Sequence, residues 1–108
     1  MRVSRRVVLV AGALLASAVH AQSRFSTEEI DLGHRQFDRT CAQCHGRNMV
    51  NSGTTVYDLR RFPVDQSDRF FISVSNGKGN MPAFKDALTP EQIKLLWCYV
   101  SSRGGKEP

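Results

Sequence analysis

The sequence contains few of the residues that build metal clusters. Its 108 residues include only three cysteines and three histidines. An iron–sulfur cluster normally takes four thiolates, which three cysteines do not provide. A structural zinc site also needs four ligands, usually as two closely spaced pairs, and Cys41 and Cys44 form the only such pair. Because the third cysteine is the distant Cys98, we expect neither kind of site.

Long apolar runs, alternating runs and basic clusters are also missing. The longest apolar run, residues 7–19, is shorter than the roughly 20 residues that span a membrane. No segment alternates for long enough to require a sheet, and no internal repeat is visible. The formal net charge of +5 comes without the basic runs interleaved with aromatic residues that bind nucleic acid. We therefore expect no nucleic-acid partner.

Residues 1–21 have the organisation of a secretory signal peptide. Arg2, Arg5 and Arg6 supply the positive end, residues 7–19 the apolar middle, and Val19-His20-Ala21 the expected cleavage site. Cleavage after Ala21 removes three of the 15 basic residues and leaves 12 against 10 acidic ones, a net charge of +2. The predicted mature part is one domain, residues 22–108. An uncleaved membrane anchor is the alternative interpretation.

The stretch Cys41-Ala42-Gln43-Cys44-His45 carries the most chemical information. Cys-x-x-Cys-His is the attachment pattern of covalently bound haem. Two thiols one helical turn apart add to the two vinyl groups of a porphyrin edge, and the next imidazole binds the iron. A thioredoxin-like redox pair would need a neighbouring strand pattern, which is missing. We predict one haem c, attached through Cys41 and Cys44, with His45 as an axial ligand.

Met81 is the candidate for the second axial ligand. It lies in a glycine-rich loop between two predicted helices, and Pro82 favours an extended backbone that presents a side chain from a loop. Met49 follows His45 by four residues and is too near to reach the opposite haem face easily. His34 is expected on the solvated side of a helix. An open sixth position remains the alternative.

Capping signals predict helices along the mature part. Ser26 and Glu29 form a capping box for a helix that ends near Thr40. Gly33 within that helix costs stability, which indicates close approach by another helix. The other expected elements are a short helical turn over 57–61, a helix over 65–76 capped by Asp65, and a helix from Thr89 that ends before Gly104.

Together these motifs resemble those of small class I cytochromes c. The resemblance covers the whole mature part and is carried by Cys41 to Gly46, Asn76 to Phe84, Leu88 to Ile93 and Leu96 to Val100. It implies an all-α fold, three to four helices and loops wrapped around one haem. It also implies that the first helix crosses the last, where Gly33 and Phe37 meet Leu96 and Tyr99.

Residues 48–63 are similar to small cytochromes that accept electrons from periplasmic pyrroloquinoline-quinone alcohol dehydrogenases. One departure concerns the haem-binding histidine. In many class I cytochromes c, a carbonyl at a proline soon after this histidine accepts its second N–H. No proline occurs here between His45 and Pro63. The N–H still needs a partner, and the sequence leaves that carbonyl unidentified.

These features predict an electron carrier, not an enzyme, exported to a bacterial periplasm. A His45/Met81 pair leaves no open position on iron. The implied partners are redox proteins: a periplasmic dehydrogenase, a terminal oxidase or another cytochrome. Membrane contact is expected only through partners or an uncleaved signal. The alternative is a haem enzyme subunit or gas sensor with a displaceable sixth ligand, which needs a nearby acid–base group. No His, Asp or Glu occurs from Gly77 to Phe84.

Two further features have competing interpretations. Arg60 and Arg61 fit a haem propionate, or form a solvated charge pair. Cys98 lies about 140° around the helix from Ile93, which predicts partial exposure. It is then either a small buried hydrophobe despite this angle, or a reactive thiol that permits a disulfide-linked dimer.

Overall fold

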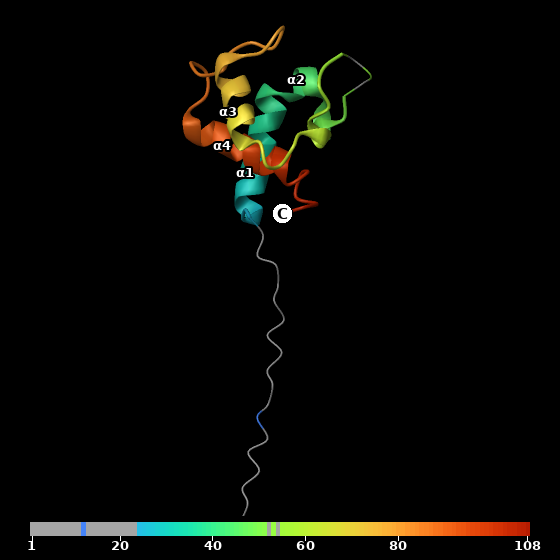
Figure 1. Ribbon diagram of the computed structural model, residues 1–108, viewed down its shortest axis with the longest axis vertical. Coiled ribbons are helices and arrows are strands. Elements are labelled where there is room, and N and C mark those ends of the chain that lie inside the picture. The colour runs from blue at the N-terminus through green and yellow to red at the C-terminus, as the bar shows by residue number, and fades with distance from the viewer. Residues whose placement is uncertain (1–11, 13–23, 52, 54) are drawn as a thin grey trace, which may run out of the picture.

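The computed structural model describes residues 12, 24–51, 53 and 55–108. Within them it is helical, and a single isolated bridge between Lys78 and Met81 is the sole β feature. The all-α prediction is therefore confirmed. The predicted signal peptide, residues 1–21, falls outside the described part except for residue 12. The elements, shown in Figure 1, are α1 (Thr27–Thr40), α2 (Ala42–His45), η1 (Arg47–Met49), η2 (Leu59–Arg61), α3 (Ser67–Asn76) and α4 (Pro90–Ser101).

Helices α1 and α4 begin at the N-caps that the sequence predicts, Ser26 and Thr89, and both starts are capping boxes. At α1 the Ser26 hydroxyl accepts from the Glu29 N–H at 3.1 Å, and the Glu29 carboxylate accepts from the Ser26 N–H at 3.0 Å. Thr89 and Gln92 repeat this arrangement at α4, with Pro90 as the first helical residue. These bonds satisfy amide groups that have no partner inside the helix.

The start of α3 differs from the prediction. The helix begins at Ser67 with Gln66 as its N-cap, so Asp65 is not the cap. The Gln66 N–H donates to the Pro63 carbonyl at 3.2 Å, and Gln66 itself has non-helical backbone angles. This preceding turn uses residues 63–66 before the helix can start. The N-cap therefore lies one residue later than expected, at Gln66 instead of Asp65.

The centre of the fold is the crossing of α1 over α4. A Cβ built at Gly33 would overlap the Leu95 carbonyl oxygen and come within 3.0 Å of the Tyr99 Cβ. The Phe37 and Tyr99 rings lie 5.1 Å apart next to this crossing. Gly33 therefore permits the close approach that its position in a helix predicts. The surrounding core consists of Ile30, Phe37, Met49, Phe62, Phe70, Val74, Leu88, Ile93, Leu96, Trp97, Tyr99 and Val100.

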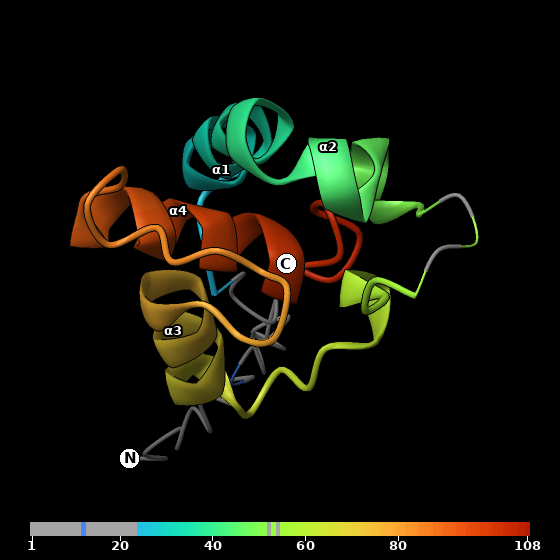
Figure 2. The ribbon, with the colours of Figure 1, turned by 90° about the horizontal axis from the view of Figure 1, so that it is seen from above.

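The predicted partial exposure of Cys98 is wrong. Its exposed fraction is 0%, and its thiol is free. Figure 2 shows the reason, because α4 lies between α1 and α3 and is covered from two sides. A helical wheel that assumes one inner face underestimates the burial of such a helix. Cys98 is the small buried hydrophobe of the two interpretations.

Helix α4 ends in a turn that contains an unusual arginine. The Arg103 N–H donates to the Val100 carbonyl at 3.1 Å and the Gly104 N–H to the Tyr99 carbonyl at 2.9 Å. This is a Schellman motif, in which glycine normally occupies the left-handed position. Here Arg103 occupies it, with φ 53°. A non-glycine residue costs roughly 1–2 kcal/mol in this conformation.

Candidate haem site

Cys41, Cys44 and His45 share one helical turn, directly after α1. The N–H groups of Cys44 and His45 both donate to the Cys41 carbonyl, at 3.2 and 2.9 Å. This turn sets the two thiols at the spacing that the motif predicts. Gly46 ends it with φ 86°, where a Cβ would overlap the Val50 carbonyl oxygen. Glycine is therefore required directly after the histidine.

The two thiols are not set up as a redox pair or a zinc site. Cys41 is half-buried, Cys44 is exposed, and neither forms a disulfide. Burial, and then the neighbouring Cys44, raise the pKa of Cys41 to about 12. Catalytic dithiols have a lowered pKa and zinc binds thiolates, so both functions are disfavoured. Among the described residues, no cluster of three or more His, Cys, Asp or Glu side chains could hold a metal ion.

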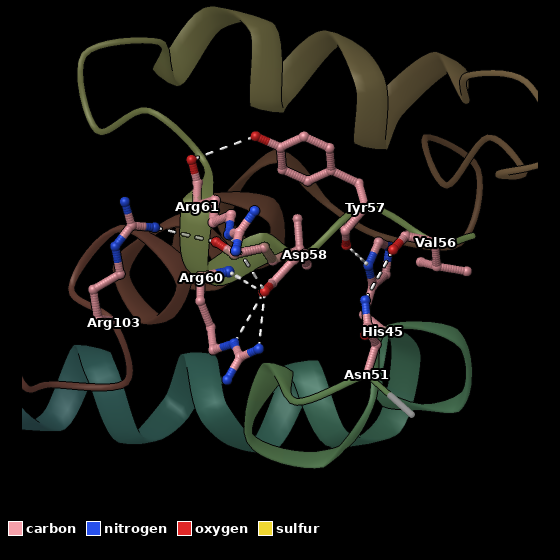
Figure 3. Close-up of polar contacts among 9 residues, drawn as sticks. His45, Asn51, Val56, Tyr57, Asp58, Arg60, Arg61 and Arg103 are labelled. Carbon is pink, nitrogen blue, oxygen red and sulfur yellow. Dashed lines mark hydrogen bonds and ion pairs between the residues drawn. The ribbon is translucent and has the colours of Figure 1, made fainter. Parts of the chain in front are cut away.

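The His45 ring is oriented by a backbone carbonyl. Its Nδ1 lies 3.2 Å from the Tyr57 carbonyl oxygen, and Figure 3 marks this contact with a dashed line. A carbonyl can only accept, so Nδ1 carries the proton and Nε2 presents a lone pair. Burial lowers the pKa of His45, although the Tyr57 hydrogen bond raises it in part. The ring is thus neutral near pH 7, the form that binds metals. Tyr57 supplies the carbonyl that accepts the second imidazole N–H, which the sequence left unidentified.

Met81 lies in a tight loop that folds back on the end of α3. The backbones of Lys78 and Met81 exchange two hydrogen bonds, of 3.1 and 3.0 Å. A Cβ at Gly77 would lie 2.6 Å from the Met81 carbonyl oxygen, so this reversal requires glycine. The Phe84 N–H then donates to the Val74 carbonyl at 2.9 Å. The loop is therefore fixed to the body of the protein on both sides of Met81.

The surroundings of this loop and of α2 fit a haem. In Figure 1 both lie at the end of the molecule away from the start of α1. Partly buried apolar side chains pack against the core, and apart from Phe25 before α1 they come from the haem-binding motif, η2, α3 and the Met81 loop: Cys41, Ala42, Leu59, Phe71, Met81 and Phe84. Partly exposed apolar surface of this kind suits a porphyrin, whose burial adds to a small core. Thiols, a neutral imidazole and a thioether are the donors that haem c takes.

The remaining sequence candidates lie in other surroundings. His34 stacks on Tyr99, with ring centroids 4.6 Å apart. Met49 is a core residue, 3% exposed. Arg60 donates two side-chain hydrogen bonds of 2.9 Å to the Asp58 carboxylate. Arg61 is 85% exposed, with its Nε 4.0 Å from the same carboxylate, and a propionate role for the two arginines stays a prediction.

Two surface hollows lie apart from the haem-binding motif. One, of about 790 Å³, lies between the start of α1 and the C-terminal turn. The other, of about 570 Å³, lies beside Tyr99 and Met49. Neither is lined by the two motif cysteines, His45 or Met81. The candidate site is therefore defined by the donor side chains and by the apolar side chains around them, and not by either hollow.

Comparison with known proteins gives the family. A model described as cytochrome C oxidase, cbb3-type, subunit III matches residues 28–100. Cytochrome c6 of Gloeothece citriformis is 37% identical over 78 residues, which are 68% of this chain and 71% of that protein. Cytochrome c6 of Nostoc is 39% identical over 72 residues, 63% of this chain and 65% of its own length.

The chain belongs to the cytochrome c family. It is a small class I cytochrome c, similar to cytochrome c6, with one covalently bound haem c, and is an electron carrier of this type. The quinohemoprotein alcohol dehydrogenase ADH-IIG of Pseudomonas putida is 35% identical over 79 residues, 71% of this cytochrome but 11% of the dehydrogenase. Within the described residues, no helix of the cytochrome is long and apolar enough to cross a membrane.

The hydrogen bonds at His45 and in the segment that follows it leave little signal in the sequence. Tyr57 acts through its backbone, so its residue type gives no signal. Asn51 donates to the Val56 carbonyl at 2.9 Å, and Arg103 donates to two carbonyls around η2. The missing proline after His45 was the one available sign that a more distant segment supplies the carbonyl.

Proposed function

We propose that this cytochrome is a periplasmic electron carrier whose iron is held by His45 and Met81. The observation that carries the proposal is the His45 Nδ1–H donated to the Tyr57 carbonyl. It fixes the tautomer and leaves Nε2 free to bind iron, as second-shell carbonyls do for metal-binding histidines. The haem supplies a one-electron couple.

The remaining donors have separate tasks. Cys41 and Cys44 hold the porphyrin covalently through thioethers, which retains the cofactor in a fold with a small core. Met81 would supply the second iron ligand, and a Met/His pair raises the potential relative to stronger donors. With both donors bound, the iron would have no open position for a substrate or a gas. Pro82 and the hydrogen bonds of the Lys78–Met81 turn hold the backbone from which the Met81 side chain extends.

We further propose that electrons come from a quinoprotein alcohol dehydrogenase and pass towards a terminal oxidase. The similarity to a cytochrome segment of a quinohemoprotein alcohol dehydrogenase supports such a donor. Residues 1–21 would direct export and be removed, so that the mature chain begins at Gln22. The family description names an oxidase subunit, which makes a place within a larger complex the second candidate.

Intact mass and electron transfer test this proposal. The purified protein should have the mass of residues 22–108 plus one haem, and Cys41→Ala should reduce haem incorporation strongly. Mixed in a stopped-flow instrument with a purified quinoprotein alcohol dehydrogenase and alcohol, the oxidised protein should become reduced. Omission of the alcohol is the control. Failure of reduction by the dehydrogenase, with normal reduction by ascorbate, would contradict the proposed donor but leave the haem assignment intact.

A further inference from the structure

The Tyr57 carbonyl needs support of its own. It follows His45 by 12 residues and lies just before the short turn η2. Its position relative to the imidazole therefore depends on what fixes residues 56–62. Figure 3 shows that carbonyls of this segment accept hydrogen bonds from side chains of other segments. Asn51 holds the Val56 carbonyl at 2.9 Å on one side.

Arg103 holds the other side. Its guanidinium donates to the Leu59 carbonyl at 3.1 Å and to the Phe62 carbonyl at 2.6 Å. These two carbonyls bracket η2. The Arg103 side chain is 20% exposed, and its Nε lies 3.9 Å from the mostly exposed Glu107 carboxylate. One planar donor group thus connects the C-terminal turn to both ends of η2.

The backbone of Arg103 gives a second, independent observation. It occupies the left-handed position of the turn after α4, with φ 53°. Glycine is preferred there, and Gly104 and Gly105 follow directly. An arginine in this position indicates that its side chain provides something that glycine would not.

We propose that Arg103 is a positioning residue for the axial histidine. It fixes η2 and thereby the Tyr57 carbonyl that accepts the His45 Nδ1–H. The inference rests on the proposed axial role of His45. Loss of the Arg103 hydrogen bonds lets the carbonyl move and weakens this N–H···O bond. A weaker bond makes the imidazole a less basic ligand, which favours reduced iron and raises the midpoint potential.

Three variants separate this effect from charge and folding. Arg103→Gly removes the side chain and relieves the left-handed backbone, so the turn itself is not weakened. Arg103→Lys keeps the charge but loses the planar fork. Lys106→Gly removes the same charge from an exposed position in the same turn and serves as the matched control.

The readouts are the midpoint potential and the solvent exchange of the His45 Nδ1 proton, observed by NMR in the haem-loaded protein. We expect the His45 Nδ1 proton to exchange at least tenfold faster in Arg103→Gly than in Lys106→Gly. We also expect a higher midpoint potential in Arg103→Lys, which keeps the charge, than in the wild type. Arg103→Gly with the exchange rate and the potential of Lys106→Gly would overturn the inference.

The wild type gives a test that needs no variant. If residues 56–62, which Asn51 and Arg103 hold, open as a unit, the exchange rates of the His45 Nδ1 proton and the Phe62 amide proton should have the same denaturant dependence. Exchange through separate openings would refute the inference. A His45 Nδ1 proton without the large NMR shift of an iron ligand would contradict the axial role of His45 itself. A shifted proton that is insensitive to Arg103 contradicts only the positioning role.

Discussion

Substitution of Gly33 by alanine tests the helix crossing on which the site is built. A Cβ at this position would overlap the Leu95 carbonyl oxygen and lie 2.9 Å from the carbonyl carbon. These are backbone atoms in the middle of α4, so they cannot rotate away. Instead α1 and α4 must separate, which loosens the packing of Phe37 and Val100, both 0% exposed.

The expected change in the free energy of unfolding of Gly33→Ala follows from two opposing effects. Alanine is favoured over glycine in a helix interior by about 1 kcal/mol. Overpacking a core costs typically about 1–3 kcal/mol and occasionally more. Because the neighbour is a rigid backbone, we expect the upper end of this overpacking cost. The net loss of stability is then about 2 kcal/mol. For a domain of this size each kcal/mol lowers Tm by roughly 4–8 °C.

The assay is thermal and denaturant unfolding of the haem-loaded protein, followed by circular dichroism. Arg35→Ala is the control, because Arg35 is exposed on the same helix and such changes usually stay within about 0.5 kcal/mol. Gly33→Ala should be clearly less stable than this control. Equal or greater stability would show that α1 and α4 do not approach as closely as described.

Three further predictions concern stability and reactivity. The hydrogen bonds from Arg60 lower the pKa of Asp58. This pair therefore stabilises the fold above the ordinary Asp pKa of 3.8, and its contribution disappears as the pH falls through the lowered pKa. Asp58→Asn should lose less stability than the wild type in an acid titration. Cys98 should stay unreactive towards a thiol reagent until the protein unfolds, and non-reducing gels should show a monomer. Met49→Ala should cost about 2–3 kcal/mol in denaturant unfolding, because Met49 is 3% exposed.

Local signals predict the fold well where one segment determines its own structure. The capping box at Ser26 and the Thr89-Pro90 start of α4 are satisfied within a few residues, and both are confirmed. Asp65 has the same capping chemistry, but the turn that begins at Pro63 takes precedence. The Cys98 prediction was wrong because exposure on a helix depends on how many neighbours cover it.

The residues of the candidate site also differ in how far the sequence predicts them. Cys41, Cys44 and His45 are adjacent in the sequence, so their shared helical turn is predictable. Tyr57 contributes a carbonyl, which every residue type has, and Arg103 reaches η2 across 41 to 44 residues. Neither contact leaves a local pattern. Met81 is predicted from its loop, and its role as a ligand stays a prediction.

The axial pair is the central claim, and carbon monoxide binding tests it most directly. Reduced wild-type protein and Met81→Ala are titrated with carbon monoxide side by side, and the oxidised forms are checked for the weak Met–iron absorption at about 695 nm. We predict no carbon monoxide binding and a visible band in the wild type, with ready binding and no band in Met81→Ala. Equal binding by both proteins, or an unchanged band in Met81→Ala, would contradict it.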